Sequence, residues 1–147
     1  MKKIILNLFL LALGGSAFAQ DAVSYQMPPK AIADLLLAKP TPAVSIDSKA
    51  EWMLFSERNS YPSVEELAMP EYRIAGMRIN PNNFSRSRQT YINNFSLKNI
   101  KTAKAVVVTG LPTPLYAGDV SWSPSETKIA FINTTANSVD LYVIDVA

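Results

Sequence analysis

A strand–turn–strand pattern occurs twice in the sequence, and this repetition constrains the fold more than any other feature. The segments VSIDSKAEWMLF (residues 44–55) and VSWSPSETKIAF (residues 120–131) have the same length and are identical at three of their twelve positions. The turn that begins at Asp47 aligns with the Ser-Pro turn that begins at Ser123. Because two isolated strands make only a marginally stable structure in water, a repeated pair indicates a fold assembled from successive similar sheets.

A second correspondence has a different spacing. The segment NNFSLKNI (residues 93–100) resembles DLYVIDVA (residues 140–147), with Phe95 aligned to Tyr142 at an offset of 47 in the numbering. The first correspondence has an offset of 76, so the first copy should contain an insertion that accounts for the difference of 29. Spacings of about 40–50 residues are typical of the four-stranded blades of β-propellers.

The sequence therefore predicts an all-β fold, an incomplete β-propeller of about one and a half to two four-stranded blades in residues 43–147. The insertion is expected at about residues 57–90. A single small β-sandwich, whose halves resemble one another by chance, is the alternative. Seven strands are expected, at residues 43–46, 52–56, 91–97, 105–109, 119–122, 128–133 and 140–146.

Residues 1–19 have the layout of a secretory signal peptide. Two lysines precede an apolar run at residues 4–13, and an Ala-Phe-Ala pattern ends at Ala19, immediately before Gln20. The run is too short to span a bilayer, so cleavage between these two residues would leave no stable membrane anchor. We expect export to the periplasm or the extracellular space, with residues 20–42 forming a short N-terminal arm.

Composition excludes several classes of chemistry. Without Lys2 and Lys3 the chain has twelve basic and twelve acidic residues, so it lacks the clustered positive charge of a nucleic-acid-binding protein. The sequence contains no histidine and no cysteine. We therefore expect no metal site, no cofactor and no catalytic residue, because neither a Ser–His pair nor a G-x-S-x-G motif is present outside the signal segment.

The insertion combines a helix signal with a basic segment. Ser63 is a suitable N-cap, and Glu65 and Glu66 follow in the first turn, where the helix dipole favours negative charge. An excursion of about thirty residues usually has a function or faces a partner. The segment that follows the helix signal carries four arginines, Arg73, Arg78, Arg86 and Arg88.

The insertion also carries a family resemblance. YPSVEELAMPEYRIAGMRINP (residues 61–81), preceded by PPKAIADLLLAKPTPAVSID (residues 28–47) and followed by GDVSWSPSETKIAF (residues 118–131), resembles the amino-terminal region of secreted bacterial glutamyl endopeptidase-like enzymes. These enzymes belong to the prolyl oligopeptidase family of serine peptidases. The resemblance extends from about Met27 to Ala147.

The resemblance implies a β-propeller above an α/β-hydrolase domain that supplies Ser, Asp and His. Those three residues have no counterpart here, so we expect an N-terminal fragment of a secreted serine-type endopeptidase that is inactive alone. The propeller would control the access of peptide substrates to the hydrolase domain. The remaining blades and that domain would be needed for folding. The alternative is a non-catalytic periplasmic propeller that acts as a binding or scaffold module.

Arg73 and Arg78 are the candidate substrate-binding residues. If the parent enzyme prefers an acidic residue beside the cleaved bond, a guanidinium group could hold that carboxylate. Alternatively, both arginines pair with Glu71 or Glu66 and fix the insertion to its blade. Adjacent glutamates such as Glu65 and Glu66 could bind an amine, although at an exposed helix start they are more often solvated.

Three further residues lie on or beside the repeated pattern. Trp52 and Trp122 fall on expected strands and are predicted to belong to the core. In related blades the common turn after Ser-Pro is Asp-Gly, but here Ser125 is followed by Glu126. The sequence therefore predicts a turn that differs from the tight glycine-containing type.

Overall fold

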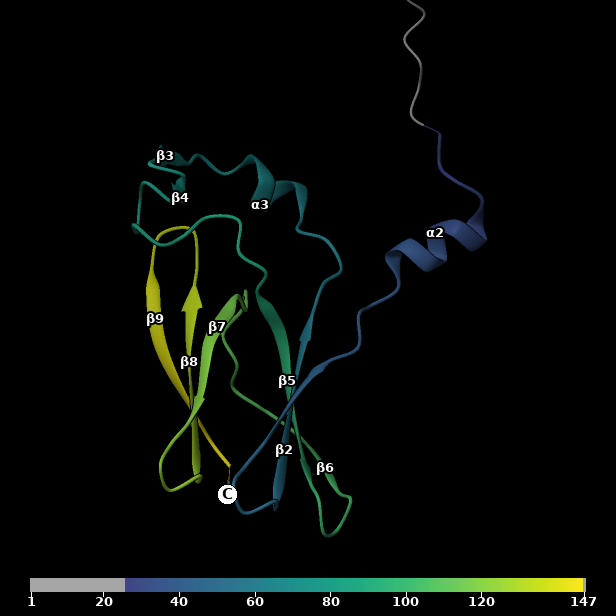
Figure 1. The fold of residues 1–147 in the computed structure, drawn as a ribbon, viewed down its shortest axis with the longest axis vertical. Helices are drawn as coiled ribbons and strands as arrows, with labels where there is room; N and C mark the ends of the chain where they lie inside the picture. Colours follow the sequence, from purple (N-terminus) through teal and green to yellow (C-terminus); the bar gives the residue numbers. More distant parts are fainter. Residues whose placement is uncertain (1–25, 147) are drawn as a thin grey trace, which may run out of the picture. The chain divides into compact units, whose positions relative to one another are not determined.

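The computed structural model describes residues 26–146, and its secondary structure is shown in Figure 1. The predicted signal peptide and its cleavage site at Ala19 and Gln20 lie outside the described residues. The chain divides after Leu35 into two units. Helix α2 (Lys30–Leu37) crosses this division and has no buried residue. Within the described residues, no helix has the length and hydrophobicity needed to cross a membrane.

The second unit contains an antiparallel sheet whose strands overlap all seven predicted segments. In the sheet, neighbouring strands follow the order β1-β2-β5-β7-β8-β9, and β6 pairs with β5; the sheet is open rather than closed. The predicted mainly-β character is confirmed, whereas the number of propeller blades stays a prediction. The strands are Ala43–Ile46 (β1), Trp52–Arg58 (β2), Ile92–Asn99 (β5), Ala105–Val107 (β6), Ala117–Trp122 (β7), Lys128–Thr134 (β8) and Val139–Asp145 (β9).

The sheet consists of two meanders, which are sets of strands paired in succession. Strands β1, β2, β5 and β6 form the first meander, and β7, β8 and β9 form the second. Only one residue pair of the ladder, Ile92 with Ala117, connects them. Since so little backbone pairing joins the meanders, side-chain packing must hold them together.

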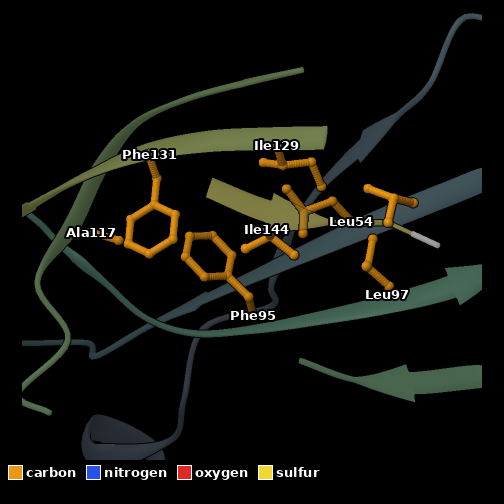
Figure 2. Packing of buried hydrophobic residues seen from close by; sticks show 8 residues of the cluster. Leu54, Phe95, Leu97, Ala117, Ile129, Phe131 and Ile144 are labelled. Atoms are coloured by element: carbon orange, nitrogen blue, oxygen red, sulfur yellow. The ribbon is translucent and has the colours of Figure 1, made fainter. Parts of the chain in front are cut away.

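That packing forms the hydrophobic core. Phe95 from the first meander contacts Phe131 from the second, with ring centroids 5.1 Å apart, and Phe131 stacks on Tyr142 at 5.4 Å. Figure 2 shows Phe95 and Phe131 together with other buried side chains, among them Leu54 and Ile144, converging between the strands. Trp52 and Trp122 are partly buried and pack against the same cluster, as predicted. The buried residues are Leu54, Phe95, Leu97, Ala117, Ile129, Phe131, Ile144 and Val146.

The turns that open the two meanders have the same hydrogen bonds. The amide of Asp47 donates to the carbonyl of Trp52, and that of Ser123 donates to the carbonyl of Lys128. Inside each turn, Ala50 and Glu126 have positive φ angles of 54° and 61°. The predicted offset of 76 between the two turns is therefore confirmed. The predicted difference in turn geometry is wrong, because Glu126 adopts the left-handed conformation that glycine usually provides.

The strand register shifts the predicted alignment of residues 93–100 with residues 140–147 by one position. Leu54 pairs with Leu97, and Ala130, the counterpart of Leu54 in the second copy, pairs with Val143. Leu97 thus corresponds to Val143 at an offset of 46, rather than the predicted 47. The cause is a β-bulge at Asn93, an extra residue in β5 that lies between two consecutive pairs of the β2–β5 ladder. A slip of one residue turns each side chain to the opposite face of a sheet.

The insertion immediately precedes this bulge in the chain. Residues 59–91, here called the excursion, join β2 to β5, whereas residues 135–138 join β8 to β9. The difference in length between these two connections is 29, as predicted. The excursion lies at the end of the strands where the β8–β9 hairpin turns (Figure 1). It contains α3 (Val64–Ala68), β3 (Tyr72–Ile74) and β4 (Met77–Ile79).

Glu126 also connects the two opening turns. Its Oε1 accepts a hydrogen bond of 2.6 Å from the backbone amide of Ser48, 78 residues earlier in the chain. This hydrogen bond lowers the pKa of Glu126 below its ordinary value of 4.5. A left-handed conformation is unfavourable for a residue with a side chain. The contact with Ser48 gives a reason for glutamate at this position in place of glycine.

We expect the contribution of Glu126 to stability to depend on pH. Since folding lowers its pKa, this contribution is present above the pKa of the unfolded chain and is lost as the pH falls through the folded pKa. Glu126→Gln should lower the melting temperature at neutral pH, and the difference from wild type should shrink in acid. Thermal unfolding followed by circular dichroism across this pH range is the measurement. An equal difference at every pH would contradict the contact.

Candidate functional site

Three asparagines attach the excursion to the second meander. Asn80 donates from Nδ2 to the carbonyl of Ala136 at 3.0 Å, and Asn83 donates to the carbonyl of Thr135 at 2.8 Å. Asn82 makes a longer side-chain contact with the same hairpin. Because the excursion belongs to the first meander, these bonds bridge the two meanders, two of them through backbone carbonyls and the third through the side-chain oxygen of Asn137.

Asn80 is central to this attachment. The residue is 8% exposed, and its Oδ1 accepts from the amide of Asn82 at 2.9 Å while its Nδ2 donates to the hairpin. Its backbone amide donates to the carbonyl of Ser85 and its carbonyl accepts from the amide of Phe84, and these two bonds close the turn that contains Pro81. Both the backbone and the side chain of this residue are therefore committed to one arrangement of the turn.

A pocket of about 360 Å³ lies between the excursion and the hairpin end of the second meander. Because an apolar pocket with a few polar groups is the usual form of a binding site, this pocket is the candidate functional site. Its wall combines aromatic rings with both signs of charge. Lining residues include Tyr61, Glu65, Glu71, Arg88, Tyr91 and Tyr116.

Two tyrosines form the aromatic part of the wall. The rings of Tyr91 and Tyr116 meet edge to face, with centroids 5.7 Å apart. Burial raises the pKa of both phenols above 10.0, and the negative charge of Glu66 raises it further. Both hydroxyl groups therefore stay protonated at physiological pH, and that of Tyr91 donates to the carbonyl of Arg86 at 3.5 Å.

A buried asparagine positions the loop that carries Tyr116. Asn133 is 2% exposed. Its Oδ1 accepts from the amide of Tyr116 at 2.7 Å, and its Nδ2 donates to the carbonyl of Pro114 at 3.3 Å. A buried polar side chain needs such partners, so β8 fixes this wall of the pocket.

Helix α3 begins with a complete capping box, in which Ser63 and Glu66 each accept the other's backbone amide hydrogen. The predicted N-cap is confirmed. Glu66 is committed to this cap through its 2.5 Å hydrogen bond with the amide of Ser63. Glu65 and Glu66 both line the pocket.

Glu71 is the centre of a group of three arginines, which we call the Glu71 cluster. Arg73 contributes Nε at 3.3 Å and Arg88 contributes Nε at 3.2 Å, while Arg78 donates from Nη1 to the same carboxylate. The side chain of Glu71 is only 9% exposed. Burial raises its pKa, but hydrogen bonds and charge from Arg88 and Arg78 outweigh burial, and the pKa falls below 4.5.

The structure thus shows the pairing with Glu71 that the alternative interpretation of Arg73 and Arg78 predicted; Glu66 is not their partner in the described contacts. Substrate binding by the two arginines stays a prediction. Sequence reasoning noted Arg88 only as part of a basic segment and missed its place in the cluster. It also missed the asparagine attachment, although the run Asn80-Pro-Asn-Asn is a visible concentration of side-chain hydrogen-bonding groups.

The chemistry of this region is that of binding. The pocket offers phenol hydroxyls, guanidinium groups and carboxylates, which can orient a polar or charged ligand. Within residues 26–146 no group of three or more His, Cys, Asp or Glu side chains is placed to hold a metal ion.

Comparison with known proteins gives partial similarity to peptidases. The chain is 28% identical over 134 residues to the probable glutamyl endopeptidase, chloroplastic, of Oryza sativa subsp. japonica, which covers 84% of this chain and 14% of the relative. It is 30% identical over 111 residues to the protein of the same name from Arabidopsis thaliana, covering 73% and 12%. The chain thus spans about an eighth of the length of these relatives. No protein-family profile and no solved structure matches it.

We expect Asn80→Ala to release the excursion from the hairpin. The substitution leaves the carbonyl of Ala136 without this donor and should reduce the free energy of unfolding by about 1–3 kcal/mol. Limited proteolysis should then cut within residues 59–91 faster than in wild type. Asn94→Ala, which removes an exposed side chain of β5, is the matched control. Equal protease sensitivity in both variants would show that Asn80 does not hold the excursion.

Proposed function

We propose that this chain forms the first blades of a β-propeller in an exported serine-type endopeptidase of the prolyl oligopeptidase family. In this proposal the propeller controls the access of peptides to an α/β-hydrolase domain outside the present sequence. The similarity to two glutamyl endopeptidases supports a relation to peptidases. The predicted signal peptide at residues 1–19 supports export.

One observation carries the propeller proposal. The face of the second meander that points away from the core repeats the apolar pattern of the face of the first meander that is buried in the core. Phe95 and Leu97 are buried against the second meander. Their counterparts in β9, Leu141 and Val143, are 72% and 54% exposed. A third meander packed in the same way would cover them.

The opposite face of the first meander shows the complementary pattern. Ile129 and Phe131 face the first meander, and their counterparts in β2 are Met53 and Phe55 on the outer face. Val44 and Ile46 pair with these residues and are about half exposed. A contact between two different faces can repeat around a ring, and the repeated ring is the architecture of a propeller.

The functional proposal is tested by sequencing the complete gene and by assaying the protein that it encodes. We expect the reading frame to encode further blades and then a G-x-S-x-G motif with a late histidine. The protein expressed from the complete gene should hydrolyse peptides, and a serine-directed phosphonate should abolish this activity. Blades that close without a hydrolase domain would instead indicate the non-catalytic scaffold and would refute the peptidase proposal.

Leu141→Asp tests the packing of the outer face. In the protein expressed from the complete gene, a following blade would bury this carboxylate, so the free energy of unfolding should fall by roughly 3 kcal/mol or more. Val64→Asp is the control, because Val64 is 83% exposed at the start of α3, where a negative charge is tolerated. Denaturant titration measures both. If the two variants were equally stable, the outer face would have no neighbouring blade.

A further inference from the structure

The β3–β4 hairpin exposes an apolar face. Tyr72 pairs with Ile79, and Ile74 pairs with Met77. Since residues directly opposite one another in an antiparallel ladder lie on the same side of it, these four side chains share one face. Tyr72, Ile74 and Met77 are 54%, 54% and 47% exposed. None of the four is among the residues that line the pocket, so this face is turned to solvent and not to the candidate site.

The end of the hairpin is uncharged and has a defined conformation. Ala75 and Gly76 form a two-residue loop with positive φ angles of 49° and 84°, and loops of this kind match the twist of the strands they join. A Cβ atom on Gly76 would meet nothing beyond its chain neighbours within 4 Å. In Figure 1 the hairpin lies at the end of the second unit, past the β8–β9 turn. Residues 74–77, here called the hairpin tip, therefore project into solvent.

Two arginines lie immediately behind the hairpin tip. Arg73 and Arg78 are directly opposite one another in the ladder, and their side chains are 71% and 42% exposed. Both contact the carboxylate of Glu71, whose single negative charge balances only one of them. From residue 72 to residue 89 the sequence contains four arginines and no acidic residue. The surface behind the tip is therefore positively charged.

An apolar tip with cations directly behind it matches the boundary of a membrane that contains anionic lipids. Interfacial segments bury apolar side chains about 5–10 Å into the boundary between headgroups and acyl chains. Since a strand rises about 3.3 Å per residue, insertion of Ile74 and Met77 would bring the two arginines to the level of the lipid phosphates. Guanidinium groups bind phosphate strongly. Tyrosine, which occurs one residue further back at Tyr72, is enriched at this level of a membrane.

The surface of another protein fits this feature less well. A stable protein interface removes about 800 Å² of surface from each partner, which is more than four residues at the end of a hairpin can supply. A fluid bilayer, in contrast, can close around a narrow protrusion. The excess positive charge favours an anionic bilayer over a neutral one.

We propose that the hairpin tip inserts into the surface of an anionic membrane, with Ile74 and Met77 in the apolar boundary and Arg73 and Arg78 on the lipid phosphates. The contact is peripheral and reversible, because a single tip buries little apolar area. This inference goes beyond the proposed function and does not depend on peptide hydrolysis.

Sedimentation with vesicles tests the inference. The protein expressed from its complete gene is mixed with vesicles of phosphatidylcholine alone, or of phosphatidylcholine and phosphatidylglycerol in equal amounts. It should bind the vesicles that contain phosphatidylglycerol roughly ten-fold more tightly or better, and physiological salt should reduce this preference. Inorganic phosphate at the concentration of the lipid phosphate should not release the protein, because it offers no apolar boundary to the tip.

Variants then locate the contact. Arg73→Gln should weaken binding to the anionic vesicles by about five-fold. Ile74→Ser should weaken it by about ten-fold, whereas Ile74→Leu should leave it unchanged. Arg58→Gln and Val64→Ser remove an exposed charge and an exposed apolar side chain outside the hairpin, and they are the matched controls. Circular dichroism and melting temperature show whether each variant is folded.

Oxidation of methionine gives an independent measurement of where the membrane contacts the chain. Met77 should react with hydrogen peroxide in solution and should lose most of this reactivity when anionic vesicles are added. Met27, which is 81% exposed in the N-terminal arm, is the internal reference and should react at the same rate with and without vesicles. Mass spectrometry of peptides from the oxidised protein measures both rates.

Several results would overturn the inference. These are equal binding to the two kinds of vesicle, no binding to either, release by inorganic phosphate, or an equal loss in Ile74→Ser and Val64→Ser. Protection of Met77 in the absence of vesicles would also overturn it, since another part of the complete protein or a second copy would then cover the tip. The two proposals can fail separately. Peptide hydrolysis without vesicle binding would refute only the membrane inference, and vesicle binding without hydrolysis would refute only the peptidase proposal.

Discussion

The contact of Phe95 with Phe131 is the interaction on which the other features depend. A single residue pair of backbone ladder joins the two meanders, so their relative position is set by side chains packed between two faces. Aromatic rings suit this task because they bury a large area and have preferred mutual geometries. Once the faces are packed, the β8–β9 hairpin lies within reach of an excursion that begins and ends on the other meander.

The excursion uses this proximity. A segment with two short strands and one short helix has few apolar contacts of its own, and none of the residues of α3, β3 or β4 is buried. The excursion is ordered instead by polar contacts, through Asn80 and its neighbours on the hairpin and through the Glu71 cluster. The pocket exists because these contacts hold the excursion over the ends of the strands.

Much of the fold could be predicted, because alternation of apolar residues and recurrence of a turn are local properties of a sequence. The strands and the equivalence of the turns at Asp47 and Ser123 followed from them. The bulge at Asn93 could not be predicted in this way, since an extra residue shows only when both strands of a ladder are paired. The conformation of Glu126 was missed for a related reason: its stabilising contact with Ser48 is 78 residues away. The candidate site depends on contacts of the same long range.

The arrangement of Arg73 opposite Arg78 is the strongest reason to regard the excursion as functional. A surface ion pair contributes little to stability, and a second and third arginine on a carboxylate already paired add repulsion as well as attraction. If these residues served only to fix the excursion, one arginine beside Glu71 would be sufficient. Departures from locally favourable design are expected at functional sites. Two arginines held opposite one another beside a single buried carboxylate are such a departure.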